Sequence, residues 1–182
     1  FFLFIILFSC QPVEKLDDVI FDNSLLSKIS LYADKKIINN NYEINYSEPY
    51  IDHSISQPPI YRLNNWLESN VNIFGSTNIL IIDIKQASLT RIERKNISKK
   101  KYEEKNEYLY EIYFLVDYTL YDDNNFNLAT VSVETKRTTT SSKLISLNEK
   151  EHIINVLILD SLIDVSLKSE ELIKEYMPEY LL

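Results

Sequence analysis

Acid–base chemistry has two possible sources in this chain. One is the stretch EPYIDH, in which Glu48, Asp52 and His53 could supply a general base and the group that orients it. The other is Asp160 and Asp164, which lie one helical turn apart and could act as paired carboxylates. Each has a structural alternative, which we favour: Asp and His side chains often bind the backbone of their own loop, and spaced acidic residues often form the solvated stripe of a helix.

Other reactive groupings are missing from the sequence. Histidine occurs only at positions 53 and 152, and Cys10 is the only cysteine, so no zinc-binding set is present. The single glycine, Gly75, cannot form a phosphate-binding loop, and there is no G-x-S-x-G nucleophile motif. We therefore expect no metal, no cofactor and no enzymatic activity. The alternative is a periplasmic hydrolase that uses the Glu48, Asp52 and His53 region.

The cysteine stands directly behind the apolar run FFLFIILFS. This run is too short for a membrane-spanning helix, which needs about 20 residues, but it fits the hydrophobic region of a secretory signal. Leu7, Phe8, Ser9 and Cys10 resemble the bacterial lipobox, although Phe8 is larger than the residue usual at its position. The resemblance implies that residues 1–9 are a signal peptide lacking its first residues and that Cys10 is lipidated. A buried N-terminal strand ending in an inert cysteine is the alternative.

Lipidation at Cys10 would determine where the protein resides. A thiolate is the side chain most easily alkylated by a lipid donor, and each buried acyl methylene contributes about 0.8 kcal/mol to membrane anchoring. Gln11 follows the cysteine, and similarity to the enterobacterial sorting rule, in which Asp at this position retains a lipoprotein in the inner membrane, implies the outer membrane. We expect a lipid-anchored protein of the bacterial cell envelope that faces the periplasm.

Composition indicates a folded domain behind the anchor. Hydrophobic residues make up 45% and charged residues 25% of the chain, as in ordinary globular proteins. The net charge of −8 argues against a nucleic-acid partner, which would require a basic face. We expect a tether over residues 10–27 and one domain over residues 28–182.

Hydrophobic periodicity predicts the elements of this domain. The spacing of apolar residues predicts a helix that opens at Pro58 and Pro59, runs to Phe74 and is capped by Gly75. A strand follows from residue 80, with a bulge at Lys85 or Gln86. A first strand is expected within residues 28–44, and the capping-box residues Ser146 and Glu149 predict a long C-terminal helix.

Two more strands form a predicted hairpin around residues 110–120 and 129–133. A two-residue loop at Asp123 and Asn124 would pair Phe114 with Val133 and Val116 with Val131, and it would set Glu111 opposite Lys136. The predicted order is therefore β-α-β-β-β-α. This order indicates an α+β two-layer sandwich, in which two helices pack on one face of an approximately four-stranded, mainly antiparallel sheet.

The other face of this sheet would carry Tyr113 and Leu115 as an apolar island among polar side chains, which makes them a possible partner surface. The basic stretch from Arg91 to Lys101 could touch lipid phosphates, but interspersed glutamates favour a plain solvated loop.

A lipidated cysteine followed by this order of elements resembles LptE, the lipoprotein partner of the lipopolysaccharide translocon, and the auxiliary lipoproteins of ABC-type lipid transporters. The stretch EPYIDHSISQPPIYRLNNWLESNVNIFGSTN also resembles uncharacterised bacterial lipoproteins. The glycine-aromatic segment that usually follows the LptE cysteine is absent, and no functional residue can be transferred. The resemblance implies a non-enzymatic binding or assembly accessory, held to the membrane through lipid on Cys10, with an outer-membrane protein or lipid-transport complex as partner.

Overall fold

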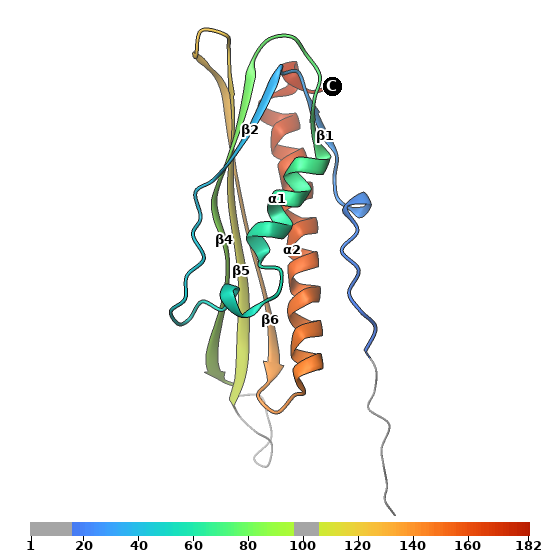
Figure 1. Cartoon of the computed structure of the whole chain (residues 1–182), viewed down its shortest axis with the longest axis vertical. Helices are drawn as coiled ribbons and strands as arrows, with labels where there is room; N and C mark the ends of the chain where they lie inside the picture. Colours follow the sequence, from blue (N-terminus) through green and yellow to red (C-terminus); the bar gives the residue numbers. More distant parts are fainter. Residues whose placement is uncertain (1–15, 97–105) are drawn as a thin grey trace, which may run out of the picture.

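The computed structural model describes residues 16–96 and 106–182 and shows an α+β fold (Figure 1). Two helices cover one face of a four-stranded sheet whose strand order is β2-β4-β5-β6. This confirms the predicted two-layer architecture. Cys10 and the predicted cleavage residues Leu7, Phe8 and Ser9 lie outside the described residues.

Three long strands form most of the sheet. β4 (Ile79–Lys95), β5 (Asn106–Tyr121) and β6 (Asn127–Ser142) pair in antiparallel order, and β2 (Lys35–Asn40) pairs in parallel with the start of β4. The predicted bulge is present, because the register of β4 shifts between Ile84 and Gln86. Alternate residues of β4 and β5 are fully buried beneath the helices, as the period of two requires.

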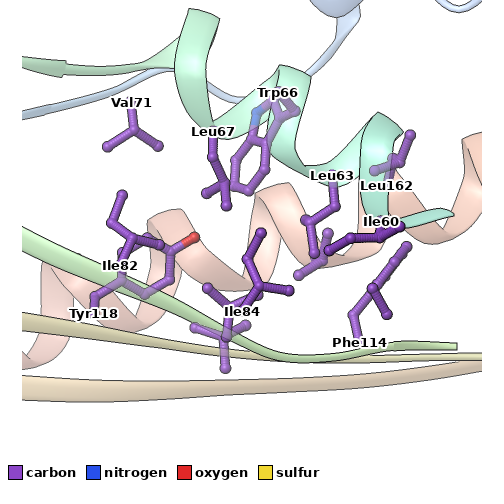
Figure 2. Packing of buried hydrophobic residues seen from close by; sticks show 14 of the residues in the cluster. Ile60, Leu63, Trp66, Leu67, Val71, Ile82, Ile84, Phe114, Tyr118 and Leu162 are labelled. Atoms are coloured by element: carbon purple, nitrogen blue, oxygen red, sulfur yellow. The ribbon is translucent and has the colours of Figure 1, made fainter. Parts of the chain in front are cut away.

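The helical layer consists of α1 (Pro59–Asn70) and α2 (Leu147–Tyr176). The predicted capping box opens α2: the Ser146 amide donates to Glu149 Oε2 at 2.7 Å, and the Glu149 amide donates to Ser146 Oγ at 3.2 Å. Figure 2 shows the core between the two layers, where α1 and α2 face the sheet. Its labelled members include Ile60, Leu63, Trp66, Leu67, Ile82, Ile84, Phe114, Tyr118 and Leu162.

The predicted hairpin register was wrong by two residues. Phe114 pairs with Thr135, and Val116 pairs with Val133. The cause is a longer tip, which holds Asn125 at a φ of 64° and is accompanied by a register shift between Leu120 and Tyr121. A shift of two positions keeps every side chain on its predicted face.

The predicted end of the first helix was also wrong. α1 stops at Asn70, and residues Val71–Ile73 form β3, which pairs in parallel with β1 (Ile29–Leu31). Lys36 Nζ, and not Gly75, satisfies the free carbonyls at the end of α1, at 3.1 Å from Leu67, 3.0 Å from Glu68 and 2.6 Å from Val71. The single strand expected in residues 28–44 is therefore divided into β1 and β2.

Residues 16–27, called the strap below, lie along the helical layer. The Asn70 side chain donates to the carbonyls of Asn23 at 2.8 Å and Leu26 at 3.1 Å. The Trp66 indole donates to the Ser27 carbonyl at 3.0 Å. Near the other end of the strap, the Asp17 carbonyl lies 3.2 Å from His152 Nδ1 on α2. Within residues 16–96 and 106–182, neither helix combines the length and apolarity needed to span a bilayer.

Candidate functional site

Asp52, the fifth residue of the EPYIDH stretch, is fully buried. It lies in a short 3₁₀ helix, η2 (Asp52–Ser54), and the residues just before this helix pair with β4 at residues 89–91. Its Oδ1 accepts a hydrogen bond from the Leu89 amide, and its Oδ2 accepts one from the Tyr42 hydroxyl, each at 2.5 Å. Burial raises the pKa of Asp52, and the two hydrogen bonds partly oppose this rise. The carboxyl group therefore fastens the loop to β4.

Glu48 and His53 do not join Asp52 in a pocket. Both side chains are exposed, whereas Asp52 is buried. The His53 ring lies 5.3 Å from the Tyr46 ring, and its Nδ1 lies 3.3 Å from the Asn45 carbonyl oxygen. These contacts are local to the loop, which agrees with the structural interpretation of the EPYIDH stretch.

Asp160 and Asp164 share one partner, Arg137. The guanidinium group of Arg137 donates to Asp164 at 2.7 Å and to Asp160 at 2.9 Å, and these contacts raise its pKa. The two carboxylates thus link α2 to β6. Sequence analysis missed Arg137, because no local pattern shows that β6 lies beneath α2.

Two shallow hollows flank this ion-pair cluster on the seam between α2 and β6. One, of about 330 Å³, includes Arg137, His152 and Asp160 in its lining. The other, of about 380 Å³, includes Glu134, Asp164 and Lys168. Among the described residues, no group of three or more His, Cys, Asp or Glu side chains is arranged to hold a metal ion.

Tyr113 and Leu115 lie on the face of the sheet opposite the helices, called the open face below, and both are half-buried. The register places Tyr113 between Ser88 and Lys136, and it places Leu115 between Gln86 and Glu134. Partial desolvation and a hydrogen bond with Glu134 raise the pKa of Tyr113. Polar side chains therefore border the two residues on both sides.

The open face also carries apolar pairs that sequence analysis missed. Ile37 pairs with Ile81 across β2 and β4, and Ile92 pairs with Leu109 across β4 and β5. Of these four, Ile37 and Ile92 are exposed. The alternation along β4 could have indicated the outward side chains, but the parallel pairing that brings Ile37 beside Ile81 has no local signal.

No protein family model matches this sequence. No curated protein matches it either. Among solved structures, a minor lipoprotein from Acinetobacter baumannii is similar at 9% identity and a TM-score of 0.40, over 82% of this chain and 96% of that chain.

Two further solved structures resemble the chain. Rare lipoprotein B from Shewanella oneidensis is 15% identical with a TM-score of 0.41, over 78% of this chain and 99% of that chain. A neuraminyllactose-binding hemagglutinin homolog from Helicobacter pylori is 8% identical with a TM-score of 0.40, over 84% of this chain and 93% of that chain. At these identities no residue of this chain is assigned a role.

Proposed function

We propose that this chain is a bacterial envelope lipoprotein, anchored through lipid on Cys10, with its domain in the periplasm and its anchor in the outer membrane. The support comes from the order of Leu7, Phe8, Ser9 and Cys10 behind an apolar run. The strap begins only six positions after Cys10. A lipid on that residue would therefore hold the folded domain close to the bilayer.

We further propose that the domain is a non-enzymatic binding or assembly accessory. The observation that carries this proposal is that the carboxylates best suited to catalysis bind other parts of the fold. Asp52 binds Tyr42 and the β4 backbone, and Asp160 and Asp164 bind Arg137. These carboxylates contribute to packing the layers together, so recognition by a surface is a simpler role for the domain than chemistry in a pocket.

The proposed partner is an outer-membrane protein or a lipid-transport complex, and the proposed contact surface is the open face around Tyr113 and Leu115. Tyrosine and leucine side chains bordered by polar groups form the kind of small apolar surface that docking partners use. The choice of partner class follows the resemblance in the order of elements to LptE-like proteins.

Membrane fractionation with lipid labelling tests the anchor. In cells that express the complete gene, the wild-type protein is expected in the membrane fraction with incorporated lipid label. Cys10→Ala is expected to incorporate no lipid label and to leave the membrane fraction. Ser27→Ala, downstream of the anchor, is expected to keep the label and to stay in the membrane fraction. Processing and membrane attachment of Cys10→Ala like the wild type would contradict the proposed anchor.

Site-specific crosslinking tests the contact surface. A photoreactive amino acid at position 113 or 115 is expected to capture an outer-membrane or lipid-transport protein. The matched control is position 167, because Leu167 is exposed on α2, in the opposite layer. Equal capture of the same protein from position 167, or no capture of an envelope protein from 113 and 115, would contradict docking through the open face.

A further inference from the structure

The strap and the connection between β6 and α2 meet at one end of the molecule. Figure 1 shows the strap descending beside α2 toward the end where β6 runs into that helix. The contact of the Asp17 carbonyl with His152 Nδ1, at 3.2 Å, fixes this position. His152 lies five residues after Leu147, the first residue of α2, which is about 7.5 Å along the helix axis. The chain therefore enters the domain near the start of α2.

This end carries two of the most exposed large apolar side chains of the described residues. Leu144 is 81% exposed and Leu147 is 76% exposed, and they flank the turn that leads into α2. Single exposed leucines are ordinary on protein surfaces. Two leucines three positions apart, at the end where the chain enters, form a local apolar tip.

We propose that this tip, Leu144 and Leu147, inserts into the headgroup region of the lipid bilayer that holds Cys10. The inference rests on the anchor in the proposed function. Leu16 lies six positions after Cys10, and a chain of that length spans at most about 22 Å. A lipid on Cys10 consequently brings the tip within reach of the membrane surface, whereas the opposite end is some 45 Å further along the 30 residues of α2.

Part of the negative charge around the tip is paired. Glu93 lies 3.0 Å from Lys143, Glu107 lies 2.7 Å from Arg94, and Glu149 accepts the backbone amide of Ser146. The two ion pairs compensate the charges of Glu93 and Glu107, which reduces their repulsion from lipid phosphates. The other described charged side chains near this end have both signs: Asp17, Asp18, Lys95, Lys150 and Glu151.

The test measures contact between the tip and lipid in the full-length lipoprotein. Lipidation consumes the thiol of Cys10, the only cysteine, so Leu144→Cys or Leu147→Cys supplies one free thiol for an environment-sensitive NBD label. The labelled protein is reconstituted in phosphatidylethanolamine and phosphatidylglycerol vesicles that contain a lipid-borne doxyl quencher. Phe126→Cys is the matched control, because Phe126 is 69% exposed and lies at the tip of the β5–β6 hairpin, at the opposite end of the sheet.

Labels at positions 144 and 147 are expected to shift to the blue and to be quenched several-fold more than the label at position 126. A second variant set places the label at Asn148→Cys in a Leu144→Ser, Leu147→Ser background, where quenching is expected to fall to the level of position 126. Equal quenching at positions 126, 144 and 147, in a protein whose lipidation is verified by mass, would overturn the insertion of the tip and leave the proposed anchor standing. A protein with unlipidated Cys10 would overturn the proposed anchor and, with it, this inference.

Discussion

The buried carboxyl group of Asp52 gives the protein a pH-dependent stability. Because burial raises its pKa above the unfolded value near 3.8, the folded state binds the proton more tightly than the unfolded state. Its contribution is therefore fully present below the unfolded pKa and is lost as pH rises through the folded pKa. In Asp52→Asn the side-chain amide can accept a hydrogen bond from the Leu89 backbone amide and donate one to the Tyr42 hydroxyl at any pH. The free energy of unfolding of the wild type minus that of Asp52→Asn is expected to fall from about pH 4 upward.

Urea denaturation at several pH values measures this difference. Asp52→Ala is the companion variant, because it leaves the Leu89 amide and the Tyr42 hydroxyl without their partner. Each buried group that loses its partner costs about 1–3 kcal/mol, so Asp52→Ala is expected to be much less stable than Asp52→Asn. A difference between wild type and Asp52→Asn that stays constant with pH, or rises, would show that burial does not dominate the titration.

A second residue-level prediction concerns two like charges on the open face. Asp83 and Asp117 are direct neighbours across β4 and β5, and both are half-buried. Like charges in this position destabilise a sheet, so Asp117→Asn is expected to stabilise the fold by about 0.2–1 kcal/mol. The gain should shrink in high salt. Asp18→Asn, on the exposed part of the strap, controls for the loss of one negative charge from a chain of net charge −8. An equal gain from Asp18→Asn would show that the effect is not local.

Some residue roles could be predicted from the sequence and others could not. Asp52 binds backbone, as the structural interpretation of EPYIDH expects, but its partner Leu89 is 37 positions away. The roles of Lys36 and Arg137 could not be predicted for the same reason, because their partners are far away in the sequence and lie on other elements. Local patterns show residue types and their spacing on one element, whereas these contacts depend on how the elements pack against one another.

At the level of elements, a glycine is needed at position 75, but not for the reason that the sequence pattern indicated. The sequence predicted a helix cap, yet the helix ends at Asn70 and the described glycine has no positive φ. A Cβ at position 75 would lie 3.0 Å from the Ala33 backbone nitrogen and 3.2 Å from its carbonyl oxygen. Close approach between two backbone segments, and not backbone handedness, requires glycine here.

Gly75→Ala is therefore expected to destabilise the protein by about 1–3 kcal/mol, the usual range for overpacking. Thermal or urea unfolding measures the loss. Because the contact is with the backbone of residue 33, the second substitution Ala33→Gly should not restore stability in the double variant. Recovery in that double variant would mean that the side chain of Ala33, and not its backbone, limits the space.

The hairpin shows why faces are easier to predict than register. The alternation of apolar residues placed Phe114 and Val116 on the buried face, and the structure agrees. The register depended on the assumed two-residue loop, and the actual tip is longer. Lys136 still reaches Glu111 at 2.9 Å, although Thr138 is the residue opposite Glu111. A diagonal neighbour satisfies the charge pattern almost as well as a direct one.

For the whole molecule, the two-layer architecture and the broad order of elements could be predicted from local sequence patterns, whereas the division of the first strand into β1 and β2 and the short strand β3 could not. The parallel pairings of β1 with β3 and of β2 with β4 could not be predicted either. Each connects segments separated by α1, so their position depends on how that helix packs and not on any nearby turn. The strap was likewise hidden within the predicted tether, because its hydrogen bonds to α1 and α2 are made between distant residues.

The strap links the proposed anchor to the helical layer, and Asn70 is the side chain that holds it most directly. Its amide donates to three strap carbonyls, those of Asn23, Leu26 and Ser27, at 2.8, 3.1 and 3.4 Å. Asn70→Ala is expected to cost about 1–3 kcal/mol locally, because the Leu26 carbonyl loses a buried donor. Backbone amides of residues 22–27 should then exchange hydrogen faster while those of β4 and β5 keep their protection.

Hydrogen-exchange mass spectrometry resolves the two regions, and Asn65→Ala is the matched control because Asn65 is exposed on the same helix. Faster exchange confined to the strap in Asn70→Ala, with Asn65→Ala like the wild type, would show that the strap opens independently of the sheet. Unchanged exchange in the strap would mean that Trp66 and Ser166, which also bind Ser27, suffice to hold it. Faster exchange throughout β4 and β5 would instead show that strap and sheet unfold as one cooperative unit, so that any force on the anchor is transmitted to the core.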